Sequence, residues 1–187
     1  EQILSLTFTD AGVSAMRVRL ASVIGVTAYR VPIFTFHGFC NEVIFRFSEY
    51  FPDLIGSKPA SELDKITLMQ KVFDSTKLEE LASFKSPYHY VKKVLGAFSL
   101  LKREAITPDE LVARLDRDEA EIKSAPDYRH EKGAHKGKVK GEYLKREEAI
   151  AKNRELAILY EKYEEALGRE LLYDFDDMIL YVVRHLE

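Results

Sequence analysis

The first fifty residues alternate between short apolar runs and helical patterns. Residues 3–8 and 31–36 are apolar runs of strand length, and each ends in threonine and phenylalanine. Residues 10–23 and 39–47 then repeat apolar side chains at spacings of three and four, the period of a helix with one buried face. Strand, helix, strand and helix in this order predict a βαβ unit of a parallel sheet.

The pattern changes at residues 51–59, which are rich in turn formers, and everything after them looks helical. Polar residues are placed to cap the helices that follow: Ser61, Ser86, Thr107 and Asp174. The clearest signal lies at residues 107–110, where threonine, proline and glutamate form a capping box with proline at the first helical position. The longest predicted helix covers residues 142–167, and the last one covers residues 175–185.

The composition predicts a chain that buries a hydrophobic core and stays inside the cell. Of 187 residues, 46% are hydrophobic, and no apolar run reaches the ~18 residues that a membrane helix requires. No export signal is recognisable, so we expect no membrane partner. The single cysteine, Cys40, excludes an intramolecular disulfide and fits a reducing, cytoplasmic location. We expect it to be a small apolar filler.

Charge is distributed unevenly along the chain. The formal net charge is −3, but residues 123–146 contain six lysines, two arginines and three acids, a local excess of five positive charges. Phosphates within about 10 Å would be attracted at moderate salt. The candidate phosphate contacts in this segment are Arg129, Lys132, Lys136, Lys138 and Lys140. The alternative is a flexible, solvated loop whose lysines only aid solubility.

The residues just past the first predicted strand could bind a nucleic acid. Open α/β sheets bind ligands at the carboxyl ends of their strands. Phe8 can offer a ring for base stacking, and the hydroxyls of Thr7 and Thr9, with nearby helix amides, can bind phosphate. The alternative for Phe8 is a core aromatic under the sheet edge.

Motifs for hydrolysis and metal binding are missing from these residues. The sequence has no GxxxxGK[ST] loop, and Gly137-Lys138 is followed by valine. Asp174, Asp176 and Asp177 are expected to cap and begin a helix, since acids there complement its dipole, so we predict no metal ion at them. His130 and His135 lack the spacing and partners of a zinc site. We therefore predict neither a catalytic nor a metal site.

Several segments, in the same order along the chain, resemble UvrD/Rep-type superfamily 1 DNA helicases. Leu6-Thr-Phe-Thr-Asp10, followed by Met16, resembles motif Ia, LTFTNxAAxEM, and Thr35-Phe-His-Gly-Phe-Cys40 resembles motif Ib, TFHSFC. Residues 94–102 and residues 107–111 resemble the helical 1B insertion. The helix and segment that lead to Walker B are resembled by Tyr160, Tyr163 and residues 174–179.

The resemblance implies a fold and a domain layout. The fold class would be mainly α, with a helical 1B-type insertion attached to a partial α/β RecA-like (P-loop NTPase) parallel sheet. Residues 1–50 would be part of domain 1A, residues 51–147 the 1B insertion, and residues 148–187 the helices that return to 1A.

The resemblance also implies which residues touch DNA. Motif Ia gives this role to Thr7, Phe8, Thr9 and Asp10, and motif Ib gives it to Thr35, Phe36 and His37. Asp10 stands where the family commonly has asparagine; an aspartate still caps a helix but repels phosphate. Gly12 and Ala15 also depart from the usual alanine and glutamate. Without the resemblance, His37 would be a helix-start histidine bonded to local backbone.

As a function, the resemblance implies part of an ATP-dependent 3′-to-5′ DNA helicase that contacts single-stranded and junction DNA. The parent enzyme would use ATP and Mg²⁺, whereas this excised piece should bind neither and should not hydrolyse ATP. Exposed sheet edges could let it self-associate. Two alternatives stay open: a recombination helicase-nuclease subunit of the AddA/RecB kind, and a non-catalytic helical interaction module.

Overall fold

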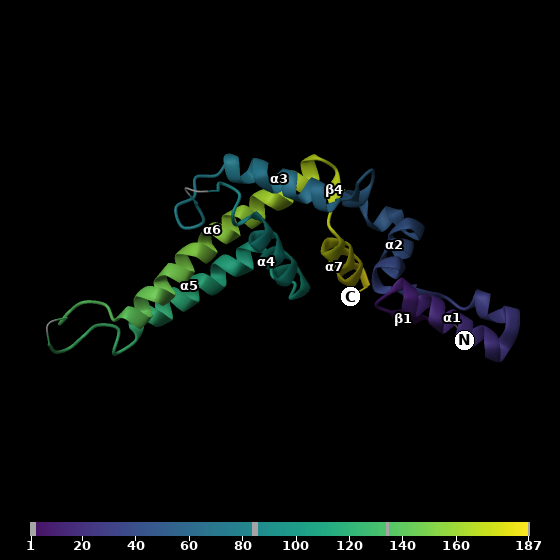
Figure 1. The fold of residues 1–187 in the computed structure, drawn as a ribbon, viewed down its shortest axis with the longest axis horizontal. Helices are drawn as coiled ribbons and strands as arrows, with labels where there is room; N and C mark the ends of the chain where they lie inside the picture. The colour runs from purple at the N-terminus through teal and green to yellow at the C-terminus, as the bar shows by residue number, and fades with distance from the viewer. Residues whose placement is uncertain (1–2, 84–85, 134, 187) are drawn as a thin grey trace. The chain divides into compact units, whose positions relative to one another are not determined.

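The computed structural model describes residues 3–83, 86–133 and 135–186 (Figure 1). Its contacts divide the chain into two compact units, which we call the sheet unit (Glu1–Pro59 with Leu171–Glu187) and the helical unit (Ala60–Glu170). The described residues form seven α-helices, three short 3-10 helices and two parallel two-stranded sheets. The predicted fold class, mainly α with a partial parallel sheet, is confirmed.

The sheet unit begins with a βαβ arrangement. Strands β1 (Ser5–Thr7) and β2 (Ile33–Thr35) are parallel neighbours, joined through helix α1 (Asp10–Ile24) and the 3-10 helix η1 (Gly25–Arg30). The strands were expected over residues 3–8 and 31–36. They are shorter, since the register joins only three residue pairs.

Helix α2 (Phe36–Arg46) follows β2 directly and begins three residues before the predicted position. Phe47, expected on its inner face, lies beyond its end as the C-cap residue. Two 3-10 turns, η2 (Ser48–Tyr50) and η3 (Pro52–Leu54), then occupy part of the predicted loop.

A second, smaller sheet was not predicted from the sequence. Strand β3 (Lys58–Pro59) pairs in parallel with β4 (Leu172–Tyr173), and helix α7 (Phe175–Leu186) follows. The pairing brings the two chain segments of the sheet unit together. α2 and α7 pack around one core cluster: Cys40, Phe51, Leu54, Met178 and Val182. Cys40 is buried as expected, and burial raises the pKa of its thiol.

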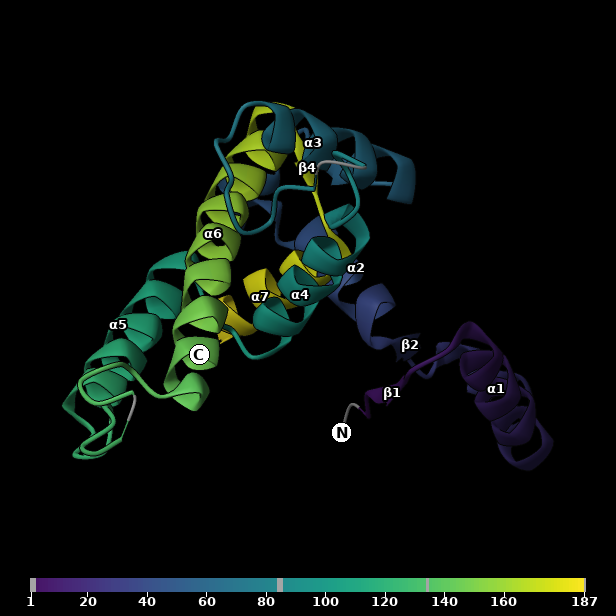
Figure 2. The same cartoon turned by 60° about the vertical axis from the view of Figure 1, so that its left-hand side comes forward.

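The helical unit consists of α3 (Glu62–Asp74), α4 (Val91–Arg103), α5 (Pro108–Ser124) and α6 (Gly141–Arg169). α6 packs against both α3 and α5, and α3 also packs against α4. In Figures 1 and 2, α5 and α6 lie side by side, with their connecting loop at one end of the pair.

The core of the helical unit is aliphatic and aromatic. The Phe98 ring stacks on Tyr160 at 4.8 Å between centroids, and Met69, Leu159 and Tyr163 are fully buried. Lys102 is only 1% exposed, and its Nζ lies 2.7 Å from the Glu164 carboxylate. Apolar burial on three helix faces is therefore the main force that joins α3, α4 and α6.

Three of the four predicted caps are confirmed. Ser61 and Thr107 form capping boxes with Asp64 and Glu110. At the start of α7, the Asp177 amide donates to the Asp174 carboxylate at 3.0 Å. The prediction at Ser86 is wrong, since turns occupy the next residues and α4 begins at Val91.

The predicted domain boundaries stay a prediction. The boundary expected between residues 147 and 148 falls inside α6, all of which groups with residues 60–170.

No apolar stretch long enough for a membrane helix was expected from the sequence, but Asp10–Arg30 is long and apolar enough, by length and composition, to cross a membrane. One such helix is weak evidence, because helices of soluble proteins pass the same test. Here the Arg17 guanidinium donates hydrogen bonds to the carbonyls of Ala28 and Val31, at 3.2 and 3.4 Å. These bonds fix α1 to the segment that leads into β2.

Candidate nucleic-acid interface

The carboxyl ends of β1 and β2 meet at one edge of the larger sheet. The parallel register places Thr7 opposite Thr35, so the residues that follow both strands emerge side by side. α1 and α2 each begin within three residues of this edge. The edge therefore collects two strand ends and two helix N-termini, whose free amides favour anions.

A threonine caps each of these helices. The Gly12 amide donates to the Thr9 hydroxyl and the Gly38 amide to the Thr35 hydroxyl, both at 3.0 Å. A Cβ atom on Gly12 would lie 2.6 Å from Thr7 Oγ1, and one on Gly38 would lie 3.0 Å from Thr35 Oγ1. Glycine thus lets the hydroxyls crowd around the helix starts. Each capping hydroxyl still has its own proton to donate.

Two phenylalanine rings form a pair at the same edge. Phe8 is 86% exposed and Phe36 is 38% exposed, and their ring centroids lie 5.0 Å apart at a tilt of 46°. The alternative interpretation of Phe8, a core aromatic, is wrong. An apolar ring this exposed offers a face on which a base could stack.

Asp10 and His37 lie exposed beside this ring pair. Asp10 is the first residue of α1, where a carboxylate complements the helix dipole. The His37 ring meets Phe175 edge to face, with centroids 5.5 Å apart. This contact was not predicted from the sequence, because Phe175 lies 138 positions further along the chain. The seven residues predicted from the two strand ends are thus brought together.

The other predicted contacts lie in the helical unit, on residues 127–140, which we call the basic arm. Its backbone folds back on itself through a bridge between Arg129 and Val139. The His130 amide donates to the Lys138 carbonyl at 2.9 Å, and the Gly137 amide donates to the His130 carbonyl at 2.8 Å. The arm is a hairpin, a structure that the lysine-rich sequence did not reveal.

Carboxylates fix the base of the arm to α6. Asp127 accepts bonds from Lys140, at 2.7 Å, and from the Tyr143 hydroxyl, and these two donors hold the pKa of Asp127 below its usual range. Tyr128 donates to Glu147 at 2.5 Å. The bond to the carboxylate, followed by burial, raises the pKa of each tyrosine.

The predicted cations of the arm therefore divide into two groups. Lys140 is paired with Asp127, and Arg129 donates to the Gly137 carbonyl at 2.7 Å while lying over the Tyr128 ring. By contrast, Lys132, Lys136 and Lys138 are exposed toward the tip. Two of the five candidates thus make contacts that stabilise the hairpin, although Arg129 is also exposed, and the other three are exposed to solvent.

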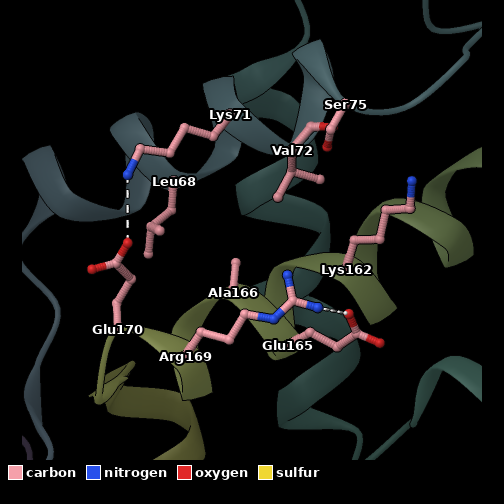
Figure 3. A pocket seen from close by; sticks show the side chains of 9 residues that line it. All are labelled: Leu68, Lys71, Val72, Ser75, Lys162, Glu165, Ala166, Arg169 and Glu170. Carbon is pink, nitrogen blue, oxygen red and sulfur yellow. Dashed lines mark hydrogen bonds and ion pairs between the residues drawn. The ribbon is translucent and has the colours of Figure 1, made fainter.

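A hollow of about 340 Å³ lies between α3 and α6 (Figure 3). Its floor is apolar, and its rim holds two ion pairs, Lys71 with Glu170 at 3.5 Å and Arg169 with Glu165 at 2.7 Å. Lys162 donates to Thr76 at 3.0 Å. The charged side chains of the rim pair with neighbouring side chains, so we interpret the hollow as part of the contact between the two helices and not as a catalytic centre.

The two predictions about metal ions concern acids at α7 and histidines on the arm. Asp174 and Asp177 are buried, and each accepts a backbone amide at the start of α7, which matches their predicted capping role. The rings of His130 and His135 lie 5.8 Å apart at a tilt of 44°. We assign no ligand role to either set.

A family model described as UvrD/REP helicase N-terminal domain matches residues 1–187. No curated protein matches the chain.

Proposed function

The chain belongs to the UvrD/REP helicase family, and from this premise we propose that it forms the DNA-contacting part of an ATP-dependent helicase. The sheet edge with Phe8 and Phe36 binds the single strand, and the basic arm binds the duplex at the junction. The family resemblance supports 3′-to-5′ movement, and the single cysteine supports a cytoplasmic location.

One observation carries the proposal for the sheet edge. The Thr7–Thr35 register places two capping hydroxyls, two helix N-termini and the Phe8–Phe36 ring pair within one small area. Base stacking needs an exposed ring, and phosphate binding needs hydrogen-bond donors. Phe8 provides the first, and the hydroxyls of Thr9 and Thr35 provide the second. Asp10 supports α1 and does not itself hold phosphate.

The arm suits a duplex because its charge is concentrated and its base is fixed. Lys132, Lys136 and Lys138 extend from a hairpin, so they can reach neighbouring phosphates without sequence preference. Asp127 and Glu147 limit the freedom of the hairpin at its base. The arm therefore contacts the phosphate backbone of the duplex and does not recognise its base sequence.

We expect ATP hydrolysis to depend on other segments of the enzyme. These 187 residues contain no GxxxxGK[ST] loop to cradle phosphates. ATP and magnesium would therefore be held by residues outside this sequence, and the chain tested alone should not hydrolyse ATP. Its contribution to the cycle is to hold DNA while the ATP site opens and closes.

The test replaces Phe8 by alanine and measures the binding of a fluorescent single-stranded oligonucleotide by anisotropy. Loss of one stacked base should weaken binding by about 1 to 3 kcal/mol, or roughly five- to 150-fold in Kd. Phe45→Ala is the matched control, because Phe45 is 81% exposed in the same unit but lies near the other end of α2. Circular dichroism checks that both variants keep their helices.

Two results would contradict the proposal. Equal losses for Phe8→Ala and Phe45→Ala would remove the sheet edge from the binding site. Binding that does not change between low and moderate salt would favour the helical interaction module. A recombination subunit of the AddA/RecB kind would give the same binding results, and a nuclease assay on the parent enzyme separates it. Self-association through sheet edges is tested by sedimentation of the same samples.

A further inference from the structure

A turn at the start of α4 carries aromatic and basic side chains that the proposed function does not use. In this turn the His89 amide donates to the Ser86 carbonyl at 3.0 Å, and the Val91 amide donates to the Tyr88 carbonyl at 3.2 Å. The Tyr88 hydroxyl lies 3.0 Å from both oxygens of Asp74, at the end of α3. The turn is therefore held to its own unit by a side chain.

Two rings and an ammonium group lie together on this turn. His89 is exposed and meets Tyr90 edge to face, with centroids 4.8 Å apart. The Lys93 Nζ lies 5.9 Å from the centre of the Tyr90 ring. The arrangement offers an exposed His89 ring and a half-buried Tyr90 ring that has a cation beside it. Rings and cations together are what an unpaired base and its phosphate bind.

The charge along this helix has one sign. Residues 86–103 contain four lysines and arginines and no acid. Lys102 is buried, whereas Lys92, Lys93 and Arg103 are exposed. The first turn of α4 carries no acidic residue of its own that would complement its positive end. A polyanion would be attracted along the helix.

Gly96 lies on the same exposed side as the lysines. It follows Lys92 by four positions, one helical turn, and Arg103 follows seven positions later. A Cβ atom at Gly96 would have nothing within 4 Å, so packing does not require glycine there. Glycine inside a helix destabilises it, and it also lets another backbone come close. The opposite face of α4, with Val91 and Phe98, is buried.

We propose that this surface is a second contact for single-stranded nucleic acid. It consists of His89, Tyr90, Lys92, Lys93, Gly96 and Arg103. The rings stack a base, the cations bind phosphates, and the bare helix at Gly96 gives the sugar-phosphate backbone room to pass. The inference rests on the proposed function for the identity of the ligand, but it uses residues of the helical unit and none at the sheet edge.

The experiment uses the whole chain and a fluorescein-labelled oligothymidylate. Lys92→Ala combined with Lys93→Ala should reduce the slope of log K against log salt by about 1.4, the value for two lost phosphate contacts on a single strand. The control combines Lys77→Ala with Lys152→Ala, which removes the same charge from exposed positions of the helical unit and should leave the slope unchanged. His89→Ala should weaken binding about fivefold without changing the slope.

The Phe8→Ala variant separates this inference from the proposed function. If Phe8→Ala weakens binding but the Lys92/Lys93 variant matches its control, the second contact is wrong and the sheet edge stands. If the reverse holds, the turn binds and the sheet edge does not. If neither has an effect, both are wrong. A polyglutamate peptide that binds equally well, with the same dependence on lysine but none on His89, would identify an acidic protein partner and overturn the inference.

Discussion

Each of the two capping threonines at the sheet edge performs two tasks with one hydroxyl group. The oxygens of Thr9 and Thr35 accept a helix amide, at 3.0 Å in both cases, and this bond holds the side-chain oxygen in place and restricts the directions open to its O–H. A donor that is already restricted loses less entropy when it binds phosphate. The capping bond that starts each helix therefore also prepares the candidate site.

Asp127 makes the base of the arm sensitive to acid. Lys140 and then Tyr143 hold its pKa below the usual range in the folded chain. The stabilisation is therefore fully present above the unfolded value, about 3.9, and is lost as the pH falls through the lower folded value. We expect the Lys140 amide and the Tyr143 ring to change environment in that acid range, and NMR titration of both signals tests this expectation.

Asp127→Asn is the informative variant for this titration, because it keeps the shape and removes the charge. The acid-range change should disappear from both signals. On the alkaline side, the pKa of Tyr143 should fall toward its usual value, since the carboxylate that raises it has gone. An unchanged Tyr143 titration in Asp127→Asn would mean that Asp127 does not hold the arm.

At the scale of elements, one carboxylate on α6 holds the loop that follows α3. Glu155 accepts the backbone amides of Glu79, Glu80 and Leu81 at distances of 2.7 to 3.1 Å. Replacing Glu155 by alanine leaves these three amides without their acceptor and should lower the free energy of unfolding by about 2 kcal/mol. Urea denaturation gives the free energy, and amide hydrogen exchange at residues 79–81 locates the loss.

Glu148→Ala is the control, because Glu148 is an exposed acid on the same helix. It should change the free energy of unfolding by less than about 0.5 kcal/mol. If Glu148→Ala and Glu155→Ala destabilise the chain equally, the loop is not held by Glu155.

Some of these elements could be predicted from sequence because their causes are local. A capping box needs two side chains three positions apart, so Thr107 with Glu110 reveals the start of α5 directly. The pairing of β3 with β4 depends on segments more than one hundred residues apart, and it joins only two residue pairs. Neither segment has enough apolar alternation to predict a strand.

The candidate sites show the same division. The motif residues around Phe8 were predicted, and the exposure of its ring agrees with the stacking role that was favoured over a core position. The excess charge of residues 123–146 was also predicted. The use of Arg129 and Lys140 within the hairpin was not, since it depends on where Gly137 and Asp127 lie after folding.

At the scale of the whole molecule, the two units differ in what holds them together. The helical unit is continuous in sequence and has its own core, with Met69, Phe98, Leu159 and Tyr163 among its most buried side chains. The sheet unit joins two distant segments, and α1 has no buried residue. Burial of apolar surface is the main source of stability, so the helical unit has the stronger basis for folding alone.

We therefore expect residues 60–170, expressed alone, to unfold cooperatively in urea and to keep their helical circular dichroism. Residues 1–59 alone should give no cooperative transition, because they lack β4 and α7. Phe98→Ala should destabilise residues 60–170 by about 3 to 5 kcal/mol if the native core has formed. A non-cooperative transition, or no effect of Phe98→Ala, would show that the helical unit depends on the rest of the chain. If the helical unit folds, its binding to duplex DNA should show the same salt dependence as that of the whole chain, because the basic arm lies entirely within it.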